Sequence, residues 1–249
     1  MTRVGEILDI LGAEKSRSIG AYLETQFRYG HTPGSILAKL RLLGARMYNM
    51  KEKEVQKAVT DIEELAKKSE LNKIDQFAKV LIADGFSSRG EFDKSVQLLV
   101  NYYQQNPTSA DTELLSNRIV KYINMNFQEQ VNTGKFLDAL KTHKKYANNW
   151  LKNSNRIDTK YNIGRAYEQA GAFKDADIMY RDSLNKLTAI KGTTQEKEIK
   201  VIEKIPSLDV INLRLAQTNS QLSNYSKSYE FLRQIENPEK LTEVEQIER

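Results

Sequence analysis

The sequence contains no cysteine and only two histidines among its 249 residues. A chain without cysteine forms no disulfide and has neither a thiol nucleophile nor a cysteine ligand for zinc, and two histidines are too few for a conventional zinc site. His31 follows a glycine in a predicted turn, and His143 occupies a packing position in a predicted helix. We expect structural or solvent-exposed roles for both, and we expect no metal and no cofactor.

Sequence motifs that mark catalysis are absent as well. Neither the GxxxxGK[ST] nor the GxGxxG phosphate loop occurs, and no GxSxG turn presents a serine nucleophile. Carboxylate pairs such as Asp175 with Asp177 and Glu63 with Glu64 have the spacing of solvated helix faces. We therefore expect a protein that is not an enzyme.

Long apolar runs are missing too. The longest, residues 80–83, is far shorter than the roughly 18 residues of a membrane-spanning helix. Glu6 and Asp9 interrupt the apolar stretch at the amino terminus, which is unlike a secretory signal peptide. We expect no transmembrane segment, a cytoplasmic location if the chain is complete, and a periplasmic location if it is a fragment of a longer exported protein.

The net charge is only mildly basic, with 38 lysines and arginines against 33 acidic residues. Residues 111–160 carry a local net charge of +4 but residues 206–249 carry −2, so the cations do not continue along the chain. Nucleic-acid binding needs cations clustered on one face to contact phosphates. We expect no nucleic-acid partner, and the basic middle fits an acidic protein surface at least as well.

Helical periodicity dominates what is present, and no segment shows the alternation of a strand. Apolar residues recur every three or four positions over residues 4–11, 16–28, 34–48 and 52–69. Thr32 and Pro33 fit the cap and the first position of the third helix, and Thr193 with Glu196 fits a capping box. We expect residues 1–70 to form helical hairpins that are degenerate repeats or an amino-terminal cap.

The clearest pattern, at residues 162–187, predicts two short helices joined by a tight turn. Gly164 and Ala176 are small enough for the two helix backbones to approach each other, with Tyr167 and Tyr180 packed around them, and Gly171 marks the turn. Related patterns occur at residues 82–107, 127–150 and 213–238. Their equivalent aromatic residues follow at intervals of 44, 37 and 52 positions: Phe92, Phe136, Phe173 and Tyr225.

These hairpins resemble the tetratricopeptide repeat, a helix-turn-helix of 34 residues. Because the intervals exceed 34, the resemblance is to a divergent, bacterial-type array with lengthened helices and inserts. It implies an all-α, right-handed α-solenoid of tetratricopeptide-like hairpins over residues 71–249, with a helical insertion near residues 191–206. The exposed ends of such an array could stack on a second copy, which leaves a homo-oligomer open.

In this family the first helices of successive repeats line a concave groove that receives a peptide or a helix of a partner. The resemblance places Val80, Asp84 and Ser88 of the first clear hairpin in this groove. From the other three hairpins it places there Asn124, Gln128, Asn132, Tyr161, Arg165, Gln169, Leu213, Gln217 and Gln221. Most are amides, which both donate and accept hydrogen bonds, although amides also suit a merely solvated face.

The function implied by this resemblance is a non-catalytic scaffold or adaptor that binds a partner peptide or protein surface in the groove. Tyr161 and Arg165 are residue types enriched at binding hot spots. The alternative is a regulatory receptor whose solenoid binds a small peptide ligand and changes conformation. The two differ in whether ligand binding makes the chain more compact.

Overall fold

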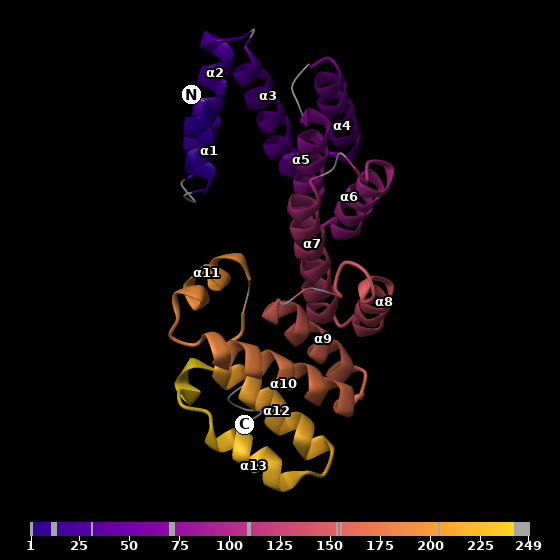
Figure 1. Ribbon diagram of the computed structural model, residues 1–249, viewed down its shortest axis with the longest axis vertical. Helices are drawn as coiled ribbons and strands as arrows, with labels where there is room; N and C mark the ends of the chain where they lie inside the picture. The colour runs from indigo at the N-terminus through magenta and orange to yellow at the C-terminus, as the bar shows by residue number, and fades with distance from the viewer. Residues whose placement is uncertain are drawn as a thin grey trace. The chain divides into compact units, whose positions relative to one another are not determined.

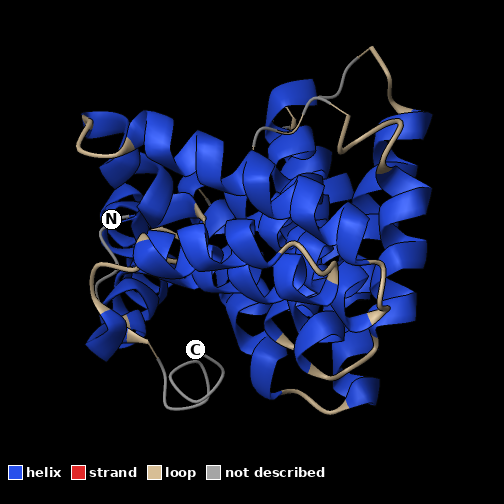
Figure 2. Cartoon of the chain, turned by 90° about the horizontal axis from the view of Figure 1, so that it is seen from below, coloured by secondary structure: helices blue, strands red, loops and turns tan. Residues whose placement is uncertain are grey.

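The computed structural model describes residues 2–10, 14–30, 32–69, 73–108, 111–152, 154, 156–203 and 205–241. Over these residues the regular secondary structure is entirely helical, with no strand (Figure 2). The expected all-α class is therefore confirmed. None of the helices described is long and apolar enough to cross a membrane.

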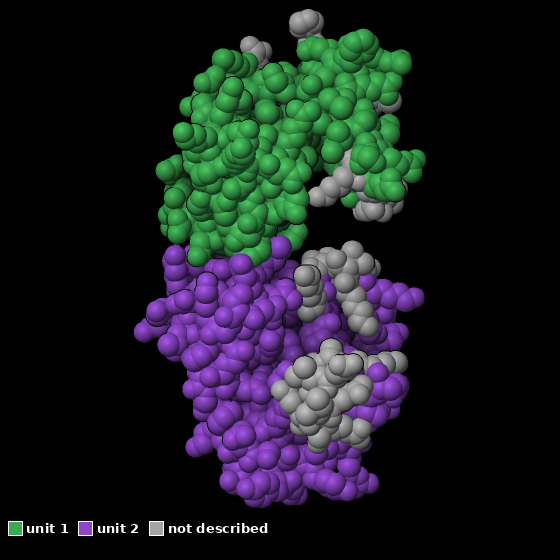
Figure 3. Space-filling view, turned by 180° about the vertical axis from the view of Figure 1, so that it is seen from behind, with its two compact units in different colours: residues 1–122 green, residues 123–249 purple. Residues whose placement is uncertain are grey.

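Two compact units divide the chain: unit 1, residues 1–122, and unit 2, residues 123–249 (Figure 3). The division falls within helix α7, which runs over Thr112–Asn132. The division at residue 122 is based on packing within each unit. The boundary expected near residue 70 is of another kind, because it separates degenerate hairpins from clear repeats in the sequence. The boundary at residue 70 stays a prediction.

Unit 1 contains the amino-terminal helices and the first part of α7 (Figure 1). Its other elements are α1 (Thr2–Ile10), α2 (Lys15–Arg28), α3 (Pro33–Arg46), the 3₁₀ turn η1 (Met47–Asn49), α4 (Glu52–Lys67), α5 (Ile74–Ser88) and α6 (Phe92–Gln105). The helices expected from periodicity over residues 4–69 are all found within a few residues of their predicted bounds.

Unit 2 contains the rest of α7 and the carboxyl-terminal helices (Figure 1). They are α8 (Phe136–Tyr146), α9 (Ile157–Gln169), α10 (Phe173–Ile190), α11 (Thr194–Ile202), α12 (Leu208–Gln221), α13 (Tyr225–Arg233) and the 3₁₀ turn η2 (Pro238–Lys240). Helix α11 is the insertion expected near residues 191–206. It lies between the hairpin α9–α10 and the hairpin α12–α13 in the chain.

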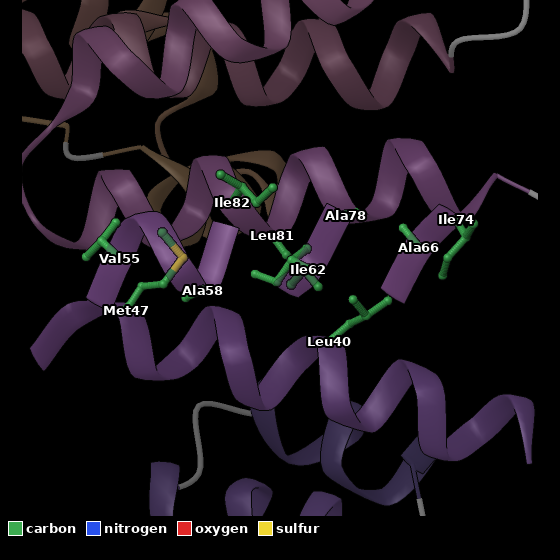
Figure 4. Packing of buried hydrophobic residues seen from close by; sticks show 10 residues of the cluster. All are labelled: Leu40, Met47, Val55, Ala58, Ile62, Ala66, Ile74, Ala78, Leu81 and Ile82. Atoms are coloured by element: carbon green, nitrogen blue, oxygen red, sulfur yellow. The ribbon is translucent and has the colours of Figure 1, made fainter. Parts of the chain in front are cut away.

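A hydrophobic core of unit 1 joins α3, η1, α4 and α5 (Figure 4). Its buried side chains recur at helical spacing and are Leu40, Met47, Val55, Ala58, Ile62, Ala66, Ile74, Ala78, Leu81 and Ile82. Met47 lies directly against Gly85 of α5, where any added Cβ would overlap its thioether sulfur. Glycine at this position therefore permits the close approach of η1 to α5.

The core of unit 2 is built from α9, α10, α12 and α13. Its buried side chains are Ile157, Ala176, Tyr180, Leu187, Ile211, Leu215, Ala216 and Phe231. Ala176 and Tyr180 are wholly buried, and Tyr180 packs on Gly164 across the α9–α10 contact. The predicted close approach of these two helices around small residues is confirmed.

One turn geometry recurs in four hairpins, α5–α6, α7–α8, α9–α10 and α12–α13. Its left-handed residue lies two positions before the equivalent aromatic: Gly90 (φ 78°), Gly134 (φ 72°), Gly171 (φ 74°) and Ser223 (φ 60°). The next N–H donates to the carbonyl five residues back, at 2.7–3.0 Å in Glu91–Phe86, Lys135–Gln130, Ala172–Tyr167 and Asn224–Asn219. This is the helix end at which glycine avoids the steric cost of a positive φ.

Two of these hairpins are closed by the same side-chain hydrogen bond. Ser95 Oγ of α6 donates to the carbonyl of Ala83 in α5, and Ser228 Oγ of α13 donates to the carbonyl of Ala216 in α12, both at 2.8 Å. In the hairpin α9–α10, Gly164 and Ala176 lie at the same distances along the chain from the turn residue as these alanines and serines do. The internal repetition inferred from the sequence therefore extends to individual contacts.

Helix ends follow the predicted capping residues. Thr32 Oγ1 accepts from the N–H of Ser35 at 3.3 Å and Pro33 is the first residue of α3. Thr193 Oγ1 accepts from the N–H of Glu196 at 3.4 Å, while the Glu196 carboxylate accepts from the N–H of Gly192 at 2.7 Å. The Thr193 cap bond of the predicted capping box is therefore present, whereas the Glu196 carboxylate accepts from Gly192, one residue before the cap.

Glu203, directly after α11, connects the insertion to the start of α9. Its Oε2 accepts from the backbone N–H of Ile157 at 2.8 Å and of Asp158 at 3.5 Å, two groups that lack partners within their own helix. Burial and the nearby Asp158 carboxylate raise the pKa of Glu203. The insertion therefore supplies part of the amino-terminal cap of a neighbouring hairpin.

Candidate functional site

The nine residues expected in the groove of unit 2 lie on three helices, α7, α9 and α12. Seven of them keep some exposed surface: Gln128, Asn132, Tyr161, Arg165, Gln169, Gln217 and Gln221. Asn124 and Leu213 are buried, with 3% and 0% of their surface exposed. Asn124 and Leu213 therefore cannot contact a partner unless the protein rearranges.

Asn124 belongs to a buried polar network between α7 and α9. Its Nδ2 donates to Asp158 Oδ2 at 2.7 Å, and its Oδ1 accepts from Asn162 Nδ2 at 3.3 Å. The Arg156 guanidinium binds both Asp158 oxygens, at 3.0 and 2.7 Å. The expectation that Asn124 faces a partner is therefore wrong, because its amide hydrogen bonds are used within the protein.

Leu213 lies in a small core beyond α12. It packs with Ile235, which follows α13, and with Leu241, which follows η2, both also buried. The expectation of an open groove position is wrong here because the segment after α13 turns back over this face of α12. Leu241 lies beyond the repeat pattern of residues 213–238 on which the expectation rested.

The exposed members on α7 and α9 are connected to each other. Arg165 Nη1 donates to Asn132 Oδ1 at 2.8 Å, and Gln169 Nε2 donates to the carbonyl of Val131 at 3.3 Å. Tyr161 is half-buried, with its ring centroid 5.6 Å from that of Tyr180. These side chains brace neighbouring hairpins and also present polar atoms at the surface of unit 2.

The members on α12 stand beside a polar cluster. Arg214 Nη1 lies 3.2 Å from Gln217 Oε1 and 3.7 Å from Glu168 Oε1 of α9, and Glu168 Oε2 accepts from the Tyr180 hydroxyl. Burial and the Glu168 carboxylate raise the pKa of Tyr180 well above its ordinary value. Gln221, at the end of α12, is exposed.

The histidine that the structure describes has a packing role, as expected. The His143 ring makes edge contacts with Phe127 and Tyr167, with centroids 6.5 and 6.3 Å apart. Burial, followed by the charge of Lys160, lowers its pKa. His31 lies outside the described residues. Among those that are described, no three side chains of His, Asp or Glu converge as a metal site would require.

Unit 1 holds an apolar pocket of about 420 Å³ between α1, α3, α5 and the start of α7. Its apolar walls are Leu37, Ile74, Phe77, Val80 and Leu114, and Glu6, Lys73, Gln76 and Asp111 provide polar atoms. Val80 is one of the groove positions implied by the sequence. The other members come from helices whose mutual packing no sequence pattern indicated, so sequence reasoning missed them.

The polar groups of this pocket are held by neighbouring backbone and side chains. Gln76, 3% exposed, accepts from the N–H of Asp111 at 2.8 Å through Oε1, and Asp111 Oδ1 caps α7 by accepting from the N–H of Leu114 at 3.0 Å. Glu6 Oε1 pairs with Arg41 Nη2 at 3.0 Å. Four helices, α1, α3, α5 and α7, are therefore fixed around an apolar recess whose wall residue Leu114 is 41% exposed.

No protein-family model and no curated protein matches the sequence. In structure, the chain is similar to BtubC (BKLC) from P. vanneervenii, known from a crystal structure, with a TM-score of 0.50 and 13% sequence identity. The similarity covers 89% of this chain and 87% of that chain. At this identity it concerns the fold alone.

Proposed function

We propose that this protein is a non-catalytic interaction scaffold, a right-handed solenoid of tetratricopeptide-like hairpins that binds a partner peptide or protein surface. The repeated turn and the repeated serine-to-carbonyl bond support the hairpin array. Repeat proteins of this kind bury their apolar faces between neighbouring repeats and leave extended surfaces for binding.

The observation that carries the proposal is the apolar pocket of unit 1. Pockets of a few hundred cubic ångströms with apolar walls and a few fixed polar groups are the usual places where ligands bind. Val80 lines it from the helix face that the family resemblance assigns to the groove. We infer that a large apolar side chain of the partner enters between Phe77 and Leu114. The backbone of the partner peptide would then lie near the polar atoms of Gln76 and Asp111.

A peptide selection tests this function. The intact protein would be screened against a displayed library of random peptides, and enriched peptides would be titrated by fluorescence anisotropy. Leu114→Arg places a cation at the pocket and should weaken binding at least tenfold. Leu137→Arg changes a similarly exposed leucine of α8 in unit 2 and should leave binding unchanged.

Three results would contradict the scaffold proposal. If no peptide is enriched, or if both leucine variants bind as the parent does, the pocket of unit 1 is not the docking site. If a bound peptide reduces the radius of gyration in small-angle scattering, the protein acts as a receptor that closes on its ligand. A scaffold would keep its radius of gyration.

A further inference from the structure

Helix α10 is the second helix of its hairpin, and its outer face packs on the following hairpin, α12–α13. Asp177 Oδ1 of α10 accepts from Asn219 Nδ2 of α12 at 2.7 Å. The Arg181 guanidinium of α10 lies over the ring of Phe231 in α13, 5.0 Å from its centroid. One amide contact and one arginine on an aromatic ring thus join two successive hairpins.

Helix α13 carries the corresponding positions without a following hairpin among the described residues. Counted from the left-handed turn residues, Tyr229 and Arg233 of α13 are equivalent to Asp177 and Arg181 of α10. Tyr229 is 63% exposed, Tyr225 one turn earlier is 68% exposed, and Arg233 is also exposed. This stripe, Tyr225, Tyr229 and Arg233, is called the tail face below.

Helix α2 of unit 1 has an unusually open apolar face. Phe27 is 92% exposed, the highest value among the large hydrophobic side chains, and Leu23 one turn earlier is 43% exposed. Gly20 lies on the same stripe, and a Cβ built there would meet nothing within 4 Å. This stripe, Gly20, Leu23 and Phe27, is called the head face below, and the glycine lets another helix approach its backbone.

The head face offers a further aromatic ring to the arginine of the tail face, whose guanidinium already lies 5.9 Å from the ring centroid of Tyr229. Phe27 could lie under the Arg233 guanidinium as Phe231 lies under Arg181, because an arginine over an aromatic ring is a favourable contact. One pair of opposite charges can also form across the contact, since Arg17 borders the head face, Glu230 borders the tail face, and both side chains are exposed. Tyrosine and arginine, the tail-face residues, are the types most enriched at binding hot spots.

We propose that the head face of one molecule binds the tail face of a second copy of this chain. The contact is heterologous, so a bound pair keeps one free head face on one molecule and one free tail face on the other, and further copies can add. The inference concerns self-association and is independent of the peptide pocket proposed above. It specifies the ends through which the array would stack.

Sedimentation velocity over a concentration series tests the contact on the full chain. The parent should show a sedimentation coefficient that increases with concentration. Phe27→Glu removes the head face and Tyr229→Glu removes the tail face, and each variant alone should sediment as a monomer. Both side chains are mostly exposed, so neither substitution should disturb the core, and circular dichroism with thermal unfolding checks this.

An equimolar mixture of the two variants is the decisive sample. The intact tail face of the first variant can bind the intact head face of the second, so the mixture should form a dimer and nothing larger. Leu137→Glu, a comparable change on exposed α8, should associate as the parent does. Leu114→Arg should also associate normally, which separates this test from that of the peptide pocket.

Four outcomes would overturn the head-to-tail contact. The first is a parent that remains monomeric at all accessible concentrations, and the second is association of both glutamate variants to the same extent as the parent. If Phe27→Glu associates alone whereas Tyr229→Glu does not, the tail face binds another tail face and the head face has no part. If the mixture of variants stays monomeric although each is folded, the two faces do not bind each other.

Discussion

A methyl group added to Gly164 would lie 2.7 Å from Cε1 of Tyr180, closer than two carbon atoms approach without overlap. The ring of Tyr180 is wholly buried, and its hydroxyl donates to Glu168. It therefore has little freedom to move away, and the contact fixes the distance between α9 and α10.

We expect Gly164→Ala to lower the free energy of unfolding by about 1–3 kcal/mol, because overpacking of the Tyr180 contact outweighs the better helix propensity of alanine. Urea unfolding followed by circular dichroism measures the change. Gly20→Ala is the matched control, since its methyl group would meet nothing, and it should raise stability by up to about 1 kcal/mol. Equal effects of the two substitutions would contradict the packing argument.

Ser223 adopts the left-handed conformation that glycine adopts in the other three hairpin turns. A side chain in this conformation costs about 1–2 kcal/mol, which glycine avoids, although glycine gains about 0.4–1 kcal/mol of entropy in the unfolded chain. We expect Ser223→Gly to raise the free energy of unfolding by up to about 1 kcal/mol. The reciprocal change Gly171→Ser should lower the free energy of unfolding. Thermal unfolding of both variants is the measurement, and shifts of the melting temperature in the same direction would contradict the argument.

Asp158 is 1% exposed and holds the network of Arg156 and Asn124. Removing its carboxylate takes away the two charged hydrogen bonds that it makes with the nearly buried Arg156 guanidinium, so Asp158→Ala should destabilise the protein by about 3–5 kcal/mol. Chemical denaturation is the measurement. Asp138→Ala removes an exposed ion pair with Lys141 and should change stability little. A small effect at Asp158 would show that the network contributes little to stability.

The lowered pKa of His143 predicts a dependence of stability on pH. The folded state resists protonating this ring, so the unfolded state takes up the proton first as the pH falls. Stability should therefore decrease as the pH falls from about 6.5 towards the folded-state pKa, and this contribution should be absent at neutral pH. His143→Phe keeps an aromatic ring beside Phe127 and Tyr167 and should lack that decrease. NMR titration of the His143 ring gives the folded-state pKa directly.

The helices and hairpin turns could be predicted from the sequence because their causes are local. Thr32 and Pro33 mark the start of α3 through a cap and a fixed φ, and Gly171 marks a turn through its positive φ. The small residue Gly164 predicted a close helix contact without knowledge of the partner atom. In each case the signal and the structure it produces lie within a few positions of each other.

The binding surface could be predicted less well because burial depends on distant segments. Asn124 is covered because Asp158, 34 positions later, binds its amide, and Leu213 is covered by Leu241 after the last hairpin. The pocket of unit 1 combines α1 and α3 with α5 and α7, for example Leu37 with Leu114. A repeat pattern assigns a residue to a helix face, but it does not show which other segment lies over that face.

The serine-to-carbonyl bonds that close two hairpins have a consequence for how the chain folds. Ser95 with Ala83 and Ser228 with Ala216 are each separated by 12 positions, so only a short loop must close before the bond forms. Proteins dominated by such local contacts fold faster than those that must first join remote segments. Each hairpin can therefore begin to form while the rest of the chain is still being synthesised.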